Sequence, residues 1–330
     1  GAICQQALRS YLTVRGDRGA EYLGDALRDY PERGGRSLRA TLCLAVARAF
    51  GAPLEEALDS AVALEMLHNS FLIHDDVEDD SEVRRGRPTL HVLHGVPIAI
   101  NVGDALSVLS LRPLLRNRGT IGARLSLRVL EEAEQMARET VEGQAIELGW
   151  RRANVVDLGD DDYLRMVLKK TCWYTTIFPT RVGALIGSRD AVDLEPFLRF
   201  GFFIGAAFQI QDDLLNLIGN RVRYGKEIGG DLWEGKRTLM IIHLLNRARR
   251  AEAARLGRFL ATPRSDKRDE EVRWVRDLMD CYGSVAYCQE VAHGLAGAAT
   301  LEFERGFAGL PDSRDLAFVR ELPAWVISRA

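Results

Sequence analysis

The sequence predicts an all-α fold. Apolar residues recur at three- and four-residue spacing over long windows of the 330-residue chain, which is the period of an amphipathic helix. Few stretches alternate between apolar and polar residues as strands do. None of the breaks between the periodic segments has the length or composition of a flexible linker. We therefore expect one helical domain over residues 1–330, although length alone leaves the number of domains open.

The predicted helices and breaks alternate along the chain. The strongest helical patterns cover residues 38–50, 61–80, 124–150 and 199–219. Glycine, proline or polar clusters interrupt the pattern at residues 31–35, 51–53, 86–88, 117–120, 153–162, 219–237 and 261–266. Two of the helices end in paired aspartates, and this recurrence is the main indication of function.

Composition limits the possible functions. With 47% hydrophobic residues, 28% charged residues and a formal net charge of −3, the chain is expected to be soluble and lacks the basic excess typical of nucleic-acid-binding proteins. No apolar run approaches the roughly 20 residues that span a bilayer, so we expect no transmembrane segment and a cytoplasmic location. The chain starts at Gly1 without Met, so the native N-terminus and any fused domain are not visible. The five cysteines form no CxxC pair and are expected to be reduced packing residues.

The first aspartate cluster ends the helix predicted over residues 61–80. Asp75, Asp76 and Asp79 occupy positions i, i+1 and i+4, so Asp75 and Asp79 are expected on one helix face, about 6 Å apart along the axis. Carboxylates at this spacing suit Mg²⁺, which takes one or two of them together with water and substrate phosphate oxygens. Glu78 and Asp80 are interpreted as solvated neighbours.

The second cluster repeats this geometry. Asp212, Asp213 and Asn216 again occupy positions i, i+1 and i+4 near the end of a strongly apolar helix. A solvated run of charges is the simpler explanation for either cluster alone. Both clusters directly follow apolar helical residues, whereas a surface charge run usually lies among polar ones. Together they favour two carboxylate clusters that share one ligand.

Seven motifs in chain order resemble those of the trans-isoprenyl diphosphate synthases, or polyprenyl synthetases. They are GGRSLRA (34–40), EMLHNSFLIHDDVEDD (65–80), RRGRPT (84–89), GQAIE (143–147), KKT (169–171), FQIQDDLLN (208–216) and GKEIGGDLWEGKRT (225–238). The resemblance spans nearly the whole chain. It implies one antiparallel helical bundle around a deep central cavity, the isoprenoid synthase fold, commonly paired as a homodimer. It also implies about three Mg²⁺ ions held by the aspartate clusters.

The resemblance implies a reaction. An allylic diphosphate loses diphosphate to give an allylic cation, isopentenyl diphosphate attacks it, and loss of a proton leaves a chain five carbons longer. Metal ions and cationic side chains would stabilise the leaving diphosphate. By resemblance, Asp75, Asp76, Asp79, Asp212, Asp213 and Asn216 would belong to the metal sites, and Arg84, Lys170, Lys226 and Lys236 would contact the allylic diphosphate. Thr171 and Gln209 match positions near the nascent cation.

A second diphosphate pocket, without metal, would bind isopentenyl diphosphate through guanidinium and imidazole donors. Arg36, Arg39, His68 and Arg85 match that pocket of the family. A lone histidine in an apolar helix is more often a core residue with one hydrogen bond, but the position of His68 on the helix that leads to the aspartates favours the ligand role.

The chain departs from the usual pattern in three places. Ser37 stands where the glycine loop usually carries a second cation, which makes the assignment of Arg36 less secure than that of Arg39. Asn216 replaces a frequent aspartate and removes one charge from the second cluster. Glu147 replaces a frequent aspartate and keeps the carboxylate.

The length of the product depends on residues before the first aspartates. Phe71 is expected about 6 Å below Asp75 along the helix, with Ser70 beside it. The bulky Phe71 would shorten the product and the small Ser70 would permit a longer one, unless Phe71 only packs the core. The motif without an insertion between its aspartates looks most like geranylgeranyl diphosphate synthases, with farnesyl and geranylfarnesyl diphosphate synthases as alternatives.

Three other functions remain open from sequence. A class I terpene cyclase carries a first aspartate motif but does not need the isopentenyl diphosphate pocket. A head-to-head synthase condenses two allylic diphosphates. A non-catalytic subunit could bind prenyl diphosphates, but it would have no chemical need for intact aspartates in both motifs.

Overall fold

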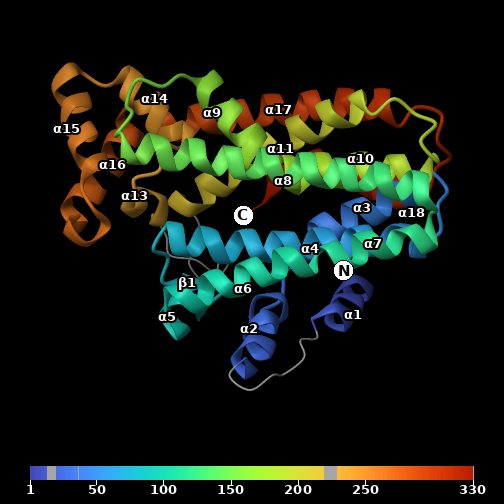
Figure 1. Ribbon diagram of the computed structural model, residues 1–330. Helices are drawn as coiled ribbons and strands as arrows, with labels where there is room; N and C mark the ends of the chain where they lie inside the picture. Colours follow the sequence, from blue (N-terminus) through green and yellow to red (C-terminus); the bar gives the residue numbers. More distant parts are fainter. Residues whose placement is uncertain (13–19, 36, 219–228, 330) are drawn as a thin grey trace. The chain divides into compact units, whose positions relative to one another are not determined.

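The computed structural model describes residues 1–12, 20–35, 37–218 and 229–329. Arg36 and Lys226, two of the predicted diphosphate ligands, lie outside these ranges. The predicted all-α fold is confirmed: the described chain consists of helices and one two-stranded hairpin (Figure 1). The four predicted helices correspond to Leu38–Ala49, Leu54–Glu78, Ala123–Arg152 and Glu195–Ile218.

The chain divides into two compact units. The first unit comprises Gly1–Met136, Tyr174–Arg199 and Phe303–Glu321, and the second comprises Ala137–Trp173, Phe200–Glu302 and Leu322–Ala330. The first aspartate cluster therefore belongs to the first unit and the second cluster to the second unit.

The elements are grouped by the unit to which they belong. Those wholly in the first unit are α1 (Ala2–Tyr11), α2 (Glu21–Glu32), α3 (Leu38–Ala49), α4 (Leu54–Glu78), β1 (Val83–Arg84), β2 (Arg87–Pro88), α5 (Leu90–His94), α6 (Val96–Leu109), α7 (Leu111–Thr120) and α10 (Phe178–Gly187). Those wholly in the second unit are α9 (Asp160–Val167), α13 (Gly230–Glu234), α14 (Leu239–Arg247), α15 (Arg250–Ala261), η2 (Arg264–Asp266) and α16 (Asp269–Cys281). Residues of both units occur in α8 (Ala123–Arg152), the π-helix η1 (Leu168–Ile177), α11 (Glu195–Ile218), α17 (Ser284–Gly306) and α18 (Arg314–Ser328).

The core of the first unit forms around α3 and α4. Helix α4 packs against α3, α6 and α7, and α10 packs against α3 (Figure 1). The approach of α10 to α3 depends on two glycines one turn apart. A Cβ at Gly183 would lie 2.7 Å from the carbonyl oxygen of Cys43, and one at Gly187 would lie 2.6 Å from that of Ala47. Only glycine allows helices to pack at this distance.

Helix α4 presents the first aspartates in its last turn. Pro53 precedes its first residue, and Glu55 and Glu56 in the first turn interact favourably with the helix dipole. Asp80 ends the helix because it adopts the left-handed conformation, with φ of 53°. The amide of Ser81 then donates to the carbonyl oxygen of Asp76 at 2.9 Å, which satisfies one of the last helical carbonyls.

A tight hairpin follows α4 where the sequence predicted only a break. Strands β1 and β2 pair Val83 with Pro88 and Arg84 with Arg87. Arg85 and Gly86 make the two-residue turn, and both have positive φ, as a type I′ turn requires. Arg33, at the end of α2, donates to the carbonyl oxygens of Arg84 at 3.0 Å and Pro88 at 2.7 Å. These bonds fix the position of the arginine-bearing hairpin.

The second unit includes a cluster of short helices. Helix α14 packs against α9, α15 and α16. The segment before it is anchored by Arg237, which is 2% exposed and donates to the carbonyl oxygens of Val155 and Gly235 and to Asn154.

Two sequence-based boundaries need correction. Residues 117–120, predicted as a break, end α7, and α13 forms within the predicted break at 219–237.

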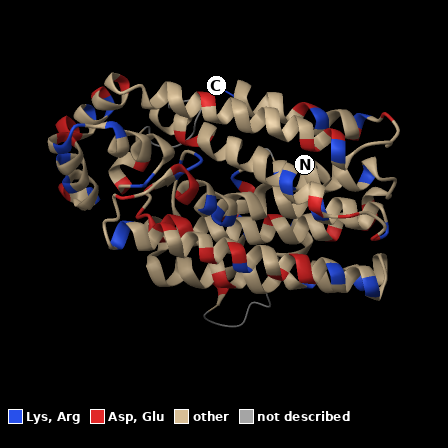
Figure 2. Cartoon of the chain, turned by 90° about the horizontal axis from the view of Figure 1, so that it is seen from above, with Lys and Arg blue, Asp and Glu red and all other residues tan. Residues whose placement is uncertain are grey.

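Acidic and basic residues both occur along the helices (Figure 2). Residues Val96–Thr120 are together long and apolar enough to cross a membrane, so the expectation that no stretch reaches this length is not confirmed. Core helices of soluble proteins pass the same test, and α6 within this stretch packs against α4.

Candidate active site

The first aspartate pair divides into a buried and an exposed carboxylate. Asp76 is fully buried, whereas the Asp75 side chain is 22% exposed. Arg84 Nε lies 2.9 Å from Asp76 Oδ1 and 3.0 Å from Oδ2, and the Tyr30 hydroxyl donates to Oδ2 at 2.5 Å. Arg84 also reaches Asp75 Oδ2 at 3.4 Å. Two protein donors therefore hold Asp76, and Asp75 is the member of the pair that solvent reaches.

Electrostatics stabilise this arrangement. The carboxylates of Asp76 and Asp75 raise the pKa of Arg84 against the opposing effect of burial, so the guanidinium stays charged. Burial and the neighbouring Asp76 raise the pKa of Tyr30, so its hydroxyl stays protonated and can donate. Asp79, the capping residue of α4, is 2% exposed, and its amide donates to the carbonyl oxygen of Asp75.

The second aspartate pair shows the same division. Asp213 is 8% exposed, whereas the Asp212 side chain is 31% exposed. Gln209 Nε2 donates to Asp213 Oδ1 at 2.7 Å, and the Tyr163 hydroxyl donates to Oδ2 at 2.8 Å. Burial and the nearby Asp231 carboxylate raise the pKa of Asp213, while these two hydrogen bonds lower it.

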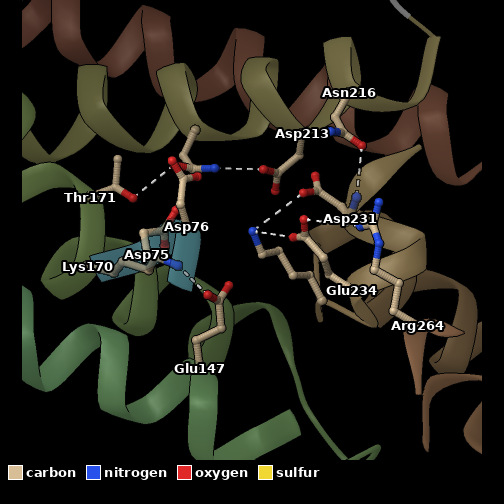
Figure 3. A network of polar contacts seen from close by, with 12 residues as sticks. Asp75, Asp76, Glu147, Lys170, Thr171, Asp213, Asn216, Asp231, Glu234 and Arg264 are labelled. Atoms are coloured by element: carbon tan, nitrogen blue, oxygen red, sulfur yellow. Dashed lines mark hydrogen bonds and ion pairs between the residues drawn. The ribbon is translucent and has the colours of Figure 1, made fainter. Parts of the chain in front are cut away.

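A directed chain of hydrogen bonds leads from Asp213 to Thr171. Because Gln209 donates its amide hydrogen to Asp213, its Oε1 atom faces Thr171, whose hydroxyl donates to it at 2.9 Å (Figure 3). The hydroxyl proton of Thr171 is thus committed to Gln209, and its oxygen keeps lone pairs. The predicted residues Thr171, Gln209 and Asp213 therefore form one hydrogen-bonded chain.

Lys170 lies in a π-helical segment that crosses α8 closely. The Lys170 ammonium pairs with Glu147 of α8 (Figure 3). One turn earlier on α8, Gly143 lies against the backbone of η1: a Cβ there would lie 2.6 Å from Lys170 Cα. The GQAIE motif therefore supplies both the space for the crossing and the carboxylate that orients the lysine. Segments of π-helix are rare and are often found at functional sites.

Lys236 and Asn216 meet the short helix α13. Lys236 Nζ lies 2.8 Å from Glu234 and 3.7 Å from Asp231. Asn216 Oδ1 accepts from the amide of Asp231 at 3.2 Å, and its backbone oxygen accepts from Gly229 at 2.7 Å (Figure 3). Asn216 therefore holds the start of α13 in this structure.

Two residues predicted for the metal-free pocket have a buried nitrogen atom with no hydrogen-bond partner among the described residues. Arg39 lies over the Tyr174 ring at 4.7 Å, and His68 stacks on the same ring at 5.6 Å. Arg39 Nη2 donates to Thr175, but Arg39 Nε and His68 Nδ1 have no hydrogen-bond partner within the described part of the chain. Arg85 in the hairpin turn donates to the carbonyl oxygens of Gly34 and Tyr30.

Burial keeps this histidine neutral. Burial, together with Arg39 and Arg85, lowers the pKa of His68 well below its usual value. A neutral imidazole can donate only one hydrogen bond, so its contribution to an anion site is directional rather than ionic.

Ser70 and Phe71 face different neighbours. Ser70 is fully buried, and its hydroxyl bonds the Gly103 carbonyl oxygen and the Ser107 hydroxyl of α6, both at 2.8 Å. Phe71 is half-buried and meets Tyr174 edge to face at 5.8 Å. Ser70 is therefore a contact between α4 and α6, and Phe71 is the larger partly accessible side chain beside it.

Sequence reasoning missed four residues that contact the predicted site. Tyr30 and Tyr163 bond the buried aspartates, Asp231 lies beside Asp213, and Arg329 pairs with Asp212 at 2.9 Å while lying over the Phe208 ring at 4.2 Å. Asp231 is inside the quoted GKEIGGDLWEGKRT motif and could have been selected from it. Neither tyrosine carries a local signal, because each lies more than 40 positions from its aspartate.

Taken together, the fold and these contacts define an all-α enzyme whose helix ends carry carboxylates and cations suited to diphosphate chemistry. The chain belongs to the polyprenyl synthetase family, whose model matches residues 20–279. It is therefore a prenyltransferase that elongates trans-prenyl chains.

Known relatives agree with this membership. Over 260 residues the chain is 34% identical to a short chain isoprenyl diphosphate synthase of Methanothermobacter thermautotrophicus, covering 78% of this chain and 77% of that protein. Over 309 residues it is 32% identical to a geranylgeranyl pyrophosphate synthase of Geoglobus acetivorans, covering 94% and 91%. The crystal structure of a geranylgeranyl pyrophosphate synthetase from Pyrococcus horikoshii matches with a TM-score of 0.87 and 28% identity, covering 100% of this chain and 96% of that one.

Proposed function

We propose that this prenyltransferase joins isopentenyl diphosphate to an allylic diphosphate in a Mg²⁺-dependent reaction and that its main product is geranylgeranyl diphosphate. The site geometry and the relatives named as geranylgeranyl or short-chain synthases support this proposal. Farnesyl and geranylfarnesyl diphosphates are the neighbouring alternatives. One catalytic domain over residues 1–330 and a cytoplasmic location stay predictions from the sequence.

The observation that carries the proposal is a pair of buried nitrogens, Arg39 Nε and His68 Nδ1, whose side chains both lie against the Tyr174 ring. Buried polar atoms in native proteins are nearly always hydrogen-bonded, so Arg39 Nε calls for an acceptor, and His68 Nδ1 calls for one in the tautomer that carries its proton there. The positive charges of Arg39 and Arg85, which both act on His68, favour an anionic ligand. A metal-free diphosphate pocket is what chain elongation needs and what a terpene cyclase does not need.

The donor set fits Mg²⁺. Within the residues that the structure describes, no group of three or more His, Cys, Asp or Glu side chains is gathered closely enough to hold a metal ion by itself. Mg²⁺ rarely uses such all-protein cages and is commonly bound by one or two carboxylates plus substrate phosphates. We propose the accessible Asp75 and Asp212 as ligands and Asp76, Asp213 and Asn216 as their supports. Asp79 joins the ligands because it follows Asp75 by one helical turn, although it is 2% exposed in this structure. When bound, the ions would neutralise charge on the departing diphosphate.

Protein side chains would bind the leaving diphosphate and stabilise the allylic cation. Lys170 and Lys236, held by Glu147 and Glu234, would contact the allylic diphosphate as it leaves, with Arg84 close to Asp75. Thr171 would present its oxygen lone pairs to the allylic cation, because Gln209 accepts its proton. A hydroxyl oxygen in this position stabilises positive charge while remaining a weak nucleophile.

A homodimer is part of the proposal. Large apolar side chains are exposed on α5 to α7 and the start of α8 in the first unit: Val92, Leu93, Val96, Ile100, Val108, Leu111, Leu115, Leu127 and Leu130. Exposed apolar surface of this extent is typical of protein–protein contacts. The most exposed of these residues, Leu115 at 69%, would lie in the contact with a second copy.

A product assay tests the proposal. The chain is incubated with labelled isopentenyl diphosphate, Mg²⁺ and, separately, dimethylallyl, geranyl and farnesyl diphosphate, and the dephosphorylated products are separated by chain length. A linear twenty-carbon product that requires both substrates is expected. Cyclic products from one substrate would indicate a cyclase, and no product from folded protein with any primer would indicate a non-catalytic subunit.

A further inference from the structure

Both aspartate motifs have the same internal division. In each pair the first aspartate is accessible, with 22% of the Asp75 side chain and 31% of the Asp212 side chain exposed. The second aspartate is buried, and both of its oxygens accept hydrogen bonds from protein donors. The same arrangement of an exposed first aspartate and a buried second one is present in each unit. Neither the charge of the motifs nor their spacing predicts it.

A tyrosine from outside the motif holds each buried aspartate. Tyr30 of α2 lies 46 positions before Asp76, and Tyr163 of α9 lies 50 positions before Asp213. Both tyrosines are 1% exposed, and each hydroxyl donates to the Oδ2 atom of its aspartate. A second donor holds Oδ1, namely Arg84 in the first motif and Gln209 in the second.

Such a contact controls the direction of the neighbouring aspartate. Successive residues on an α-helix project about 100° apart around the axis. A hydrogen bond that holds the buried aspartate therefore sets the rotation of the helix at that point, and with it the direction of the exposed carboxylate one residue earlier. Groups that orient metal ligands in this way commonly change metal affinity when they are removed.

We propose that Tyr30 and Tyr163 are positioning residues that hold the buried aspartate of each motif so that Asp75 and Asp212 present their carboxylates to divalent cations. The inference rests on the proposed function, because it concerns the metal sites of the same reaction.

The two anchors differ in strength of support. Asp76 keeps a charged partner, Arg84, when Tyr30 is altered. Among the described residues, the side-chain donor that Asp213 keeps when Tyr163 is altered is the neutral Gln209 amide, and the Asp231 carboxylate repels it. The loss of the Tyr163 hydroxyl should therefore weaken cation binding more than the loss of the Tyr30 hydroxyl.

The test measures binding of Mn²⁺, as a substitute for Mg²⁺, in the presence of inorganic diphosphate by electron paramagnetic resonance. Tyr163→Phe is expected to weaken Mn²⁺ binding about tenfold or more, and Tyr30→Phe to weaken it less. Tyr11→Phe is the matched control, because the Tyr11 hydroxyl also donates to an aspartate, Asp59 at 2.8 Å, outside both motifs. Circular dichroism confirms that each variant is folded.

A second comparison does not depend on the tyrosine variants. Asp213→Asn preserves shape and an acceptor for Tyr163, so it should weaken Mn²⁺ binding less than Asp212→Asn. Equal losses in these two variants, or unchanged binding in both tyrosine variants, would overturn the inference while leaving the proposed function intact. Failure of the unmodified chain to bind Mn²⁺ with diphosphate would overturn the metal step of the proposed function and the inference with it.

Discussion

Gly143 of α8 lies directly against the backbone of Lys170, so that an added Cβ would come within 2.6 Å of Lys170 Cα. The π-helical segment that carries Lys170 and Thr171 can cross α8 only because this position lacks a side chain. Glu147, one helical turn after Gly143 on α8, pairs with the Lys170 ammonium. A glycine without a side chain thus determines where two predicted catalytic groups lie.

Gly143→Ala should therefore reduce both stability and turnover. Forcing a methyl group against backbone costs about 1–3 kcal/mol, and the displaced Lys170 should lower kcat. Gly149→Ala is the control on the same helix, since a Cβ there meets nothing within 4 Å. It should stabilise the chain by about 0.5–1 kcal/mol. Thermal unfolding and steady-state rates check both variants, and equal melting temperatures would contradict the close crossing.

Asp75→Asn and Asp212→Asn should each lower kcat/KM by about a hundredfold or more with the fold intact, because each removes charge that would bind Mg²⁺. Asp80→Asn is the control: its side chain is 88% exposed and its left-handed conformation tolerates asparagine. Rates measured across a range of Mg²⁺ concentrations test the assignment. Near-normal rates in either of the first two variants would remove that residue from the metal site.

Arg39→Gln should raise KM for isopentenyl diphosphate about tenfold or more, since hydrogen bonds to charged groups contribute about 1.5–3 kcal/mol. KM for the allylic primer should change little. The control is Arg48→Gln on the same helix, because Arg48 pairs with Asp315 at 2.8 Å and is 46% exposed. Separate titrations of the two substrates make the distinction. An equal rise in both KM values would argue against a pocket specific to isopentenyl diphosphate.

Phe71→Ala should shift products toward longer chains, because it removes the large ring that meets Tyr174. Ser70→Ala should leave chain length unchanged, since Ser70 is fully buried against α6 and the change removes little volume. Chromatography of dephosphorylated products compares the three proteins. The same product distribution in all of them would show that chain length is limited elsewhere.

Leu115→Glu should convert a dimer into monomers by placing a charge in an apolar contact. Leu301→Glu, at an equally exposed apolar position on α17, should leave the dimer intact. Light scattering coupled to size exclusion gives the mass of each variant. A monomeric unmodified chain, or a dimeric Leu115→Glu variant, would contradict the proposed contact surface.

Much of the secondary structure was predictable because it depends on local periodicity. The helices predicted at 38–50 and 124–150 match α3 and α8 within two residues at each end. The hairpin after α4 was not predicted, because its strands are two residues long and too short to show alternation. The π-helix was also missed, since its sequence is compatible with an ordinary helix.

The sequence by itself predicted which residues would carry the chemistry: the paired aspartates, the arginines after them, the Lys-Thr motif and the glutamine before the second pair. Those assignments depend on residue type and spacing, which sequence displays directly. Only the tertiary structure showed that the two members of each pair differ in burial and in contacts. Burial and the hydroxyls of Tyr30 and Tyr163 distinguish two adjacent aspartates that are chemically identical. That distinction arises from contacts between residues far apart in the chain, which no local pattern records.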